Sequence, residues 1–311
     1  MRSSIFNSST LKLLVFLSVL VFSGAALELY CRSASRFQSS YFVLIRHFAD
    51  SDPTNAVFGD SHILWVSRIP GFSFYGTAGE QPSEFKRLVE FLYAGTPPKK
   101  IILQADPQWF GQYHVGREEF ITADNLPSRK MPLMLTSSYY LKSLKSSIVS
   151  DFENTVARYI TSARANDDPE KKWIELSSKP GFNWTWLTES ERLTLTTQRV
   201  GAQNPRDNFE SGPAAKDFES GISFLIARGA TLCLFRTPVT SSYLDTAERI
   251  KNSNYAAFDR YIHKIARVHN IKYIDFRSLP YEFADEKFLN ADHLTNEHSG
   301  EMWPLVTSAC F

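Results

Sequence analysis

The sequence lacks several features that would point directly to a class of function. Of its 311 residues, 34 are Lys or Arg and 33 are Asp or Glu, so the formal net charge is only +1. Nucleic-acid binding usually needs a clustered basic surface, which this balance does not indicate. There is no internal repeat and no low-complexity linker, and 43% of the residues are hydrophobic. We therefore expect a globular protein with a full core and no nucleic-acid partner.

The cysteines are few and do not have the spacing of a metal site. Cys31, Cys233 and Cys310 form no CxxC pair and no Cys/His ligand pattern, so we expect neither metal nor any other cofactor. Cys233 lies in the apolar run 230–235, which is typical of a buried thiol. A bridge between Cys31 and Cys310 is compatible with an oxidising compartment, although the sequence alone does not establish it.

The N-terminal region predicts where the protein is located. The run Leu13–Leu27 is apolar apart from two serines and one glycine, follows basic residues, and is followed by Glu28 and Arg32. A signal peptide and a membrane-spanning helix of roughly 20 residues both fit this pattern. We favour an uncleaved anchor over residues 1–31 with its N-terminus in the cytoplasm. Residues 32–311 would then face the periplasm or the cell exterior.

Beyond residue 50 the sequence alternates short apolar runs with amphipathic segments. The apolar runs predict strands at 57–58, 72–75, 99–104, 231–235 and 271–275. The amphipathic segments predict helices at 83–93, 214–228 and 254–268, and a last one after residue 298. Strands that are separated by helices form a parallel sheet covered on both faces, so the predicted fold class is α/β.

The alternation breaks between residues 107 and 213. This segment contains Trp, Tyr and Pro residues, long polar stretches and one predicted helix at 151–164. An insertion of this length is usually a lid or a second subdomain. Its Trp184 and Trp186 can either line a sugar-binding cleft or fill the core of the insertion, because aromatic rings carry large apolar surfaces.

The tetrapeptide Gly59-Asp60-Ser61-His62 is the most informative motif in the chain. It stands between the predicted strand at 57–58 and an amphipathic segment that begins at residue 63. A serine at such a strand-to-helix turn is exposed, and backbone N–H groups at the helix start can face an anion beside it. Ser61 is therefore a candidate nucleophile. His62 is interpreted as a turn residue or a substrate contact rather than as a base.

A candidate base for this serine lies near the other end of the chain. His293 stands in the polar segment Asn290–Thr295. A serine nucleophile needs such an imidazole, and the fold can bring the two together from distant parts of the sequence. The nearest carboxylate is Asp292, which is our candidate for orienting the ring. Adjacent side chains of an extended segment point to opposite faces, so Asp292 reaches His293 only if the chain turns between them.

These segments together resemble the SGNH (GDSL-like) hydrolases and acyltransferases, whose sequence blocks carry a Ser, a Gly, an Asn and a His. Gly59-Asp60-Ser61 matches the first block, Gly76–Glu80 is similar to the second, and His293 matches the last. The resemblance implies a flavodoxin-like parallel sheet and an acyl-enzyme on Ser61. It also implies an oxyanion hole that includes the N–H groups of Ser61 and Gly79.

The sequence departs from the family pattern at two positions. Asp106 stands where the family has an asparagine donor to the oxyanion, and an ionised carboxylate cannot donate a hydrogen bond. Either Asp106 is protonated, or Gln104 or a backbone N–H replaces the donor, or the site is weaker than that of a typical esterase. Asn290 stands where the family places the acid of its Asp-x-x-His spacing. Asn290 is therefore the alternative to Asp292 as the orienting group.

A subgroup of the family is suggested by the apolar N-terminal run, the GDSH block and the string Asp106–Phe110. These are similar to membrane-tethered SGNH-like proteins such as the D-alanyl transfer protein of teichoic acid synthesis and the alginate O-acetyltransferases. The resemblance covers roughly residues 13 to 110 and 214 to 305. It leaves the insertion uncovered.

The resemblance to this subgroup implies a membrane-anchored O-acyltransferase or esterase acting on a cell-envelope or exported polysaccharide. Its substrates would be an acylated polysaccharide or an acyl donor, and a multi-spanning membrane O-acyltransferase would be a partner. The alternative is a non-catalytic protein of the same fold that holds a polysaccharide or docks onto such an acyltransferase. Asp106 and Asn290 favour this alternative, because each replaces a residue that catalysis normally uses.

Overall fold

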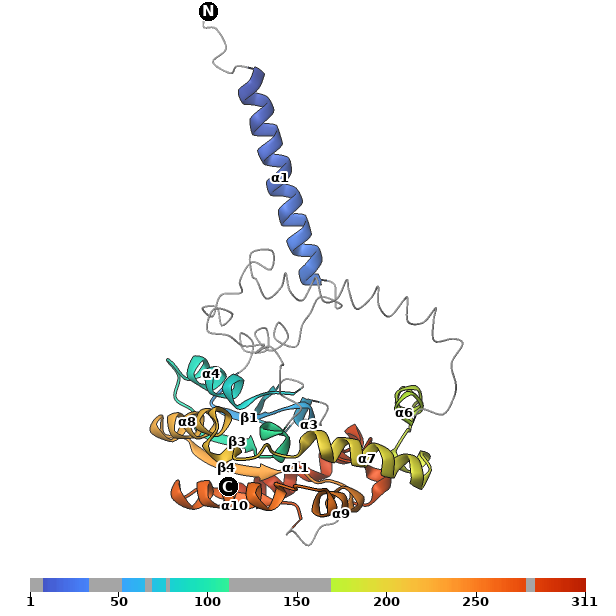
Figure 1. Cartoon of the computed structure of the whole chain (residues 1–311). Coiled ribbons are helices and arrows are strands. Elements are labelled where there is room, and N and C mark those ends of the chain that lie inside the picture. The colour runs from blue at the N-terminus through green and yellow to red at the C-terminus, as the bar shows by residue number, and fades with distance from the viewer. Residues whose placement is uncertain (1–7, 34–51, 65–68, 77–78, 112–168, 278–282) are drawn as a thin grey trace, which may run out of the picture. The chain divides into compact units, whose positions relative to one another are not determined.

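The computed structural model describes residues 8–33, 52–64, 69–76, 79–111, 169–277 and 283–311 (Figure 1). The chain divides into two compact units. One unit comprises residues 1–49 and 124–163, and its described part is the helix α1 (Ser8–Ser33). The other comprises residues 50–123 and 164–311 and contains all remaining described elements. The helix predicted at 151–164 lies outside the described residues.

The helix α1 contains the apolar N-terminal run. Its hydrophobic side chains are exposed, with Phe22 at 75%. Within the described residues, no helix combines the length and the apolar character needed to cross a membrane. The membrane-spanning anchor expected over residues 1–31 is therefore not confirmed.

A five-stranded parallel sheet forms the centre of the second unit, and it confirms the predicted α/β class. The order β2-β1-β3-β4-β5 is that of flavodoxin-like folds. All five predicted strands are present, each shifted by a few residues at most. Their bounds are Asn55–Gly59 (β1), Ser73–Gly76 (β2), Lys100–Gln104 (β3), Thr231–Arg236 (β4) and Lys272–Asp275 (β5).

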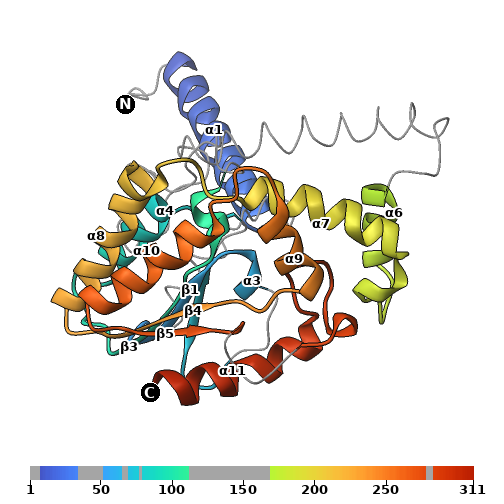
Figure 2. The ribbon, with the colours of Figure 1, turned by 60° about the horizontal axis from the view of Figure 1, so that its bottom comes forward.

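Helices cover both faces of this sheet, as the sequence predicts (Figure 2). On one face Phe58 of β1 packs edge-on against Phe85, with ring centroids 5.8 Å apart. The helices α4, α8 and α10 cover this face and have the bounds Pro82–Leu92, Pro213–Ala227 and Tyr255–Val268. On the other face Phe235 of β4 packs against Trp303 of α11 (Asn296–Cys310), at 5.5 Å. All four of these helices begin within a few residues of their predicted starts.

A disulfide joins Cys233 of β4 to Cys310 at the end of α11, with their Cα atoms 5.6 Å apart. Two expectations about the cysteines are thereby corrected. Cys233 is not a free thiol, and the partner of Cys310 is Cys233 rather than Cys31. The reason is geometric, because Cys233 and α11 belong to the same buried cluster on one face of the sheet, which brings the last turn of α11 over β4.

Within the described residues, three helices were not expected from the sequence. They are α6 (Pro169–Ser177), α7 (Glu189–Gln203) and α9 (Ser241–Arg249). The first two lie in the segment 107–213, which is therefore more helical than its polar composition indicates. The sequence does contain a local signal for the start of α7, the Thr-x-x-Glu pattern of residues 188–191. In the structure Thr188 and Glu191 form the capping box that this pattern predicts.

Candidate active site

The backbone around Ser61 is shaped by the close approach of β1 and β2. Gly59 pairs with Gly76 where the two strands end, and a Cβ atom on Gly76 would lie 2.2 Å from the Gly59 carbonyl oxygen. The short helix α3 (Ser61–Leu64) begins two residues after β1 ends. Ser61 therefore stands at the carboxyl edge of the sheet, where parallel α/β folds bind their ligands.

The structure brings the two predicted reactive residues together. Oγ of Ser61 lies 2.9 Å from Nε2 of His293, although 232 residues separate them in the sequence. His293 lies in the loop before α11, and its carbonyl oxygen accepts a hydrogen bond of 2.7 Å from the N–H of Leu289. The distance between the two side chains permits direct proton transfer from the serine to the imidazole.

Both candidate orienting groups contact the other ring nitrogen of His293. Nδ1 lies 3.0 Å from Oδ1 of Asp292 and 3.1 Å from Oδ1 of Asn290. The Asn290 oxygen also accepts the backbone N–H groups of Asp292 at 3.1 Å and His293 at 2.8 Å. This Asx turn bends the chain, which is why adjacent Asp292 and His293 can meet. Only Asp292 carries a charge that can stabilise an imidazolium.

The carboxylate of Asp292 is buried and is held mainly by α7. Nε2 of Gln203 donates to it at 2.7 Å, and Nε of Arg199 donates at 3.0 Å. Burial opposes its ionised form, but the charges of Arg199 and His293 hold the pKa of Asp292 well below its ordinary value. Asp292 is therefore an ionised acceptor for His293. Two of the residues that hold it, Arg199 and Gln203, come from the segment that the sequence marks as an insertion.

His62 is a buried cation under the predicted base. Its Nδ1 lies 2.6 Å from Asp60 Oδ1, and its Nε2 lies 3.2 Å from Asp292 Oδ2. Burial lowers its proton affinity, but the charges and hydrogen bonds of these two carboxylates raise the pKa of His62 to about 10. With both ring nitrogens facing carboxylates, His62 is an imidazolium at neutral pH. The sequence interpretation of a turn residue or substrate contact missed this role.

The environment of His293 keeps its imidazole neutral. Burial and the nearby charge of His62 lower the pKa of His293 to about 4, against the opposite effect of Asp292. Nη2 of Arg199 also lies 3.2 Å from Nδ1 and adds a further positive charge on that side. At neutral pH the ring can therefore accept a proton from Ser61. The acid, the base and the serine form a Ser-His-Asp arrangement of the kind used in acyl transfer.

The predicted oxyanion donors are less completely defined. Gly79 follows β2 and has a φ of +74°, a backbone conformation that favours glycine. Residues 77 and 78 lie outside the described residues, so the alignment of the Gly79 N–H with Ser61 stays a prediction. The N–H of Ser61 itself stands at the start of α3.

Asp106 has a different set of contacts from those of an oxyanion donor. Its carboxylate accepts the N–H of Thr237 at 3.0 Å, the Thr237 hydroxyl at 2.6 Å and Nε2 of Gln104 at 2.6 Å. Burial raises the pKa of Asp106 above its ordinary value. Gln104, the proposed substitute donor, is itself bonded to Asp60 and Asp106. Within the described residues, no hydrogen bond joins either side chain to Ser61.

The site also contains three side chains of types that commonly bind metal ions. His62, Asp292 and His293 can each offer one ligand atom, and these atoms lie within 4.8 Å of one another. However, both nitrogens of His62 already face carboxylates, and Arg199 occupies the Asp292 carboxylate. A divalent cation would meet the positive charges of Arg199 and His62, so these residues do not fit a metal.

No protein-family model matches the sequence, and no curated protein matches it. The chemistry of the site is therefore inferred from its geometry and from the sequence resemblance. Sequence reasoning identified Ser61 and His293 but missed Arg199 and Gln203. Nothing in the local sequence distinguishes these two from other polar residues of a helix.

Proposed function

We propose that the protein is an SGNH-like serine O-acyltransferase or esterase that forms an acyl-enzyme on Ser61. The observation that carries this proposal is the chain of contacts from Ser61 Oγ to His293 Nε2 at 2.9 Å, and from His293 Nδ1 to Asp292 at 3.0 Å. A nucleophile, a neutral base and an ionised orienting acid in this order are what acyl transfer requires.

The proposed reaction has two halves. Ser61 Oγ attacks an ester carbonyl while its proton passes to His293 Nε2, and the tetrahedral oxyanion is held by the N–H groups of Ser61 and Gly79. The C–O bond to the leaving alcohol then breaks, and His293 returns the proton to that alcohol. In the second half His293 takes a proton from an acceptor hydroxyl, which attacks the acyl-Ser61. The C–O bond to Ser61 then breaks, and His293 returns the proton to Ser61 Oγ. Asp292 stabilises the imidazolium in both halves.

The substrate and the location are further parts of this proposal. By resemblance, we propose that the acyl group is transferred to a hydroxyl of a cell-envelope or exported polysaccharide outside the cytoplasm, with a membrane O-acyltransferase as partner. The Cys233–Cys310 disulfide supports the location, because such bonds persist in oxidising compartments. Transfer rather than hydrolysis is proposed because an acceptor held near the enzyme competes with water.

A fluorophosphonate probe tests the nucleophile, because it reacts covalently with activated serines. We expect the folded protein to be labelled at Ser61, and Ser61→Ala and His293→Ala to lose the labelling. Ser308→Ala is a matched control, because this exposed serine of α11 bonds only within its helix at Leu305 and lies outside the site. Absence of labelling in the folded wild-type protein would contradict an activated serine.

A second candidate function is a non-catalytic protein of the same fold that binds a polysaccharide or docks onto a membrane acyltransferase. The contacts of Asp106 favour it, because this residue is bonded to Thr237 and Gln104 in place of serving as a donor beside Ser61. Under this alternative, cells that carry Ser61→Ala would acylate their polysaccharide as the wild type does. Under the enzymatic proposal, that acylation is lost.

A further inference from the structure

A pocket of about 270 Å³ adjoins the Ser-His-Asp arrangement. Arg199 and Asn290 line it, and the same two residues contact Nδ1 of His293. The pocket thus lies one side chain away from the base. Ligand pockets for drug-sized molecules usually measure about 300–1,000 Å³, so this one suits a small group.

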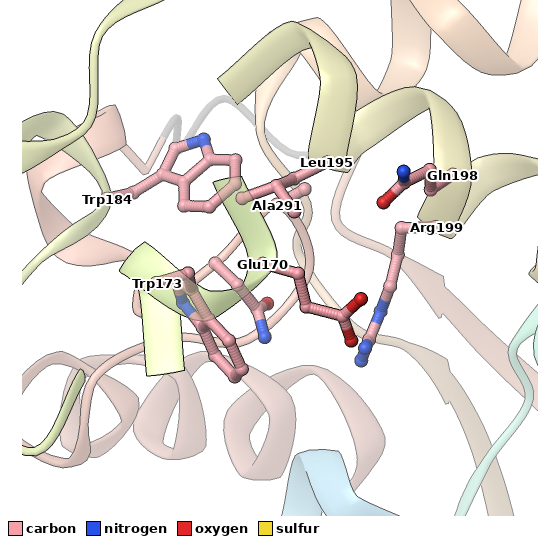
Figure 3. A pocket seen from close by; sticks show the side chains of 8 residues that line it. Glu170, Trp173, Trp184, Leu195, Gln198, Arg199 and Ala291 are labelled. Atoms are coloured by element: carbon pink, nitrogen blue, oxygen red, sulfur yellow. The ribbon is translucent and has the colours of Figure 1, made fainter. Parts of the chain in front are cut away.

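The apolar part of the pocket lining includes two indole rings, those of Trp173 and of Trp184, which is only 1% exposed (Figure 3). Both are fixed to the loop that carries the base. The indole N–H of Trp173 donates to the Leu289 carbonyl oxygen at 3.1 Å, and the backbone N–H of Trp184 donates to the Phe288 carbonyl oxygen at 2.7 Å. Flat apolar surfaces of this kind favour ligands with an apolar face.

The remaining side of the pocket is polar but nearly balanced in charge. Glu170, Gln198, Arg199 and Asn290 provide both hydrogen-bond donors and acceptors. Figure 3 shows the Glu170 carboxyl group pointing toward Arg199. Because Arg199 is also paired with Asp292 at 3.0 Å, the pocket has no excess positive charge for a phosphate or a carboxylate. A simple acyl chain would make no hydrogen bonds with this polar side of the pocket, whereas a ligand that carries hydroxyls would.

We propose that this pocket binds one uncharged sugar ring, as a subsite beside the unit that reacts at Ser61. A sugar ring combines an apolar face for the indoles with hydroxyls that both donate and accept hydrogen bonds at its edge. This inference rests on the proposed function for the identity of the reacting neighbour. The binding itself requires only the pocket.

A binding experiment tests the subsite without catalysis. Ser61→Ala protein is titrated with cellotriose, mannotriose and triacetylchitotriose at concentrations up to millimolar, and intrinsic tryptophan fluorescence is followed. We expect a saturable change with at least one of the three. In the same background, Trp173→Ala and Gln198→Ala should weaken that binding tenfold or more. Thr197→Ala is the matched control, because it is an exposed neighbour on α7 outside the pocket, and should bind as the parent does.

The outcomes separate this inference from the proposed function. If none of the three sugars binds, or if binding is equal in Gln198→Ala, Trp173→Ala and the parent, the sugar subsite is wrong even when Ser61 reacts with the fluorophosphonate. If a sugar binds in the expected way and Ser61 is not labelled, the subsite stands and the enzymatic proposal fails. Gln198 is exposed on α7, so its replacement tests the pocket even if Trp173→Ala misfolds.

Discussion

The imidazole of His62 lies flat against that of His293, with ring centroids 3.9 Å apart and planes inclined by 16°. One ring is held between the carboxylates of Asp60 and Asp292, and the other faces the serine. Two stacked imidazoles cannot both be charged at low cost, so protonation of His62 disfavours protonation of His293. His62 thereby controls the protonation state of the base, although its ring nitrogens contact Asp60 and Asp292 rather than the Ser61 hydroxyl.

The pH dependence of acyl transfer should report this pair. His293 must be neutral to accept the Ser61 proton, so activity is present above its pKa and is lost as the pH falls through about 4. His62→Gln removes the neighbouring positive charge and raises the pKa of His293, so the acidic limb of the kcat/KM profile should move to higher pH. A limb that stays in place or moves to lower pH would contradict this assignment.

The orienting acid should matter more than the orienting amide. Asp292→Ala removes the negatively charged partner of Nδ1 and the carboxylate that pairs with Arg199, so we expect kcat/KM to fall by about a hundredfold or more. Asn290→Ala should cost less, because Asp292 remains at 3.0 Å from the ring. Steady-state kinetics with an aryl acetate compares the two. If Asn290→Asp raised activity and Asp292→Ala left it unchanged, residue 290 would be the orienting position.

The close approach of β1 and β2 predicts a stability effect at Gly76. A methyl group there would meet the Gly59 carbonyl oxygen at 2.2 Å, and backbone cannot move aside as a flexible side chain can. Gly76→Ala should therefore lower the free energy of unfolding by about 1–3 kcal/mol or more. Gly201→Ala in α7 is the control, because open space surrounds it, and should be neutral or stabilising by up to about 1 kcal/mol. Urea unfolding followed by circular dichroism measures both.

The disulfide should contribute measurably to stability. Cys310→Ser opens a link between residues that are 77 apart in sequence, and we expect a loss of about 2–4 kcal/mol in the free energy of unfolding. Reducing agent should lower the stability of the wild type but not of Cys310→Ser. Cys31→Ser should unfold like the wild type. Peptide mapping that links Cys31 to Cys310 would contradict the bridge.

The proposed location can be checked with a reporter. Alkaline phosphatase folds only in an oxidising compartment, so a fusion after residue 50 should be active if the following domain is exported. A cytoplasmic reporter at the same position should then be inactive. The reverse pattern would place the domain in the cytoplasm and would contradict both the location and its link to the disulfide.

The strands and the reactive pair were predictable because their signals are local. Each strand is a short apolar run, and Ser61 stands in a strand-turn-helix segment whose Gly59 leaves room for the Gln104 side chain of β3. His293 was predictable because it stands in the polar segment Asn290–Thr295, which resembles the last block of the SGNH pattern. Such signals depend on neighbours in sequence, so they need no knowledge of tertiary packing.

The rest of the site depends on contacts between distant segments. Arg199 contacts Asp292, which lies 93 positions further along the chain. The sequence of α7 has no pattern that distinguishes Arg199 from the other polar residues of the helix. The partner of Cys310 could not be deduced from spacing, because cysteine connectivity is decided by the fold. His62 reads as an ordinary turn residue until Asp60 and Asp292 are placed on its two nitrogens.

The separation of 232 residues between Ser61 and His293 has a consequence for biogenesis. As the chain is synthesised, the serine remains without a base until the 232 residues that lead to His293 have followed it. Closing so long a loop is among the slower steps of folding, because non-local contacts form only after their entropy cost is met. Ser61 therefore becomes an activated nucleophile only late in folding, when His293 reaches it. A truncated chain that ends before residue 293 has no base for this serine.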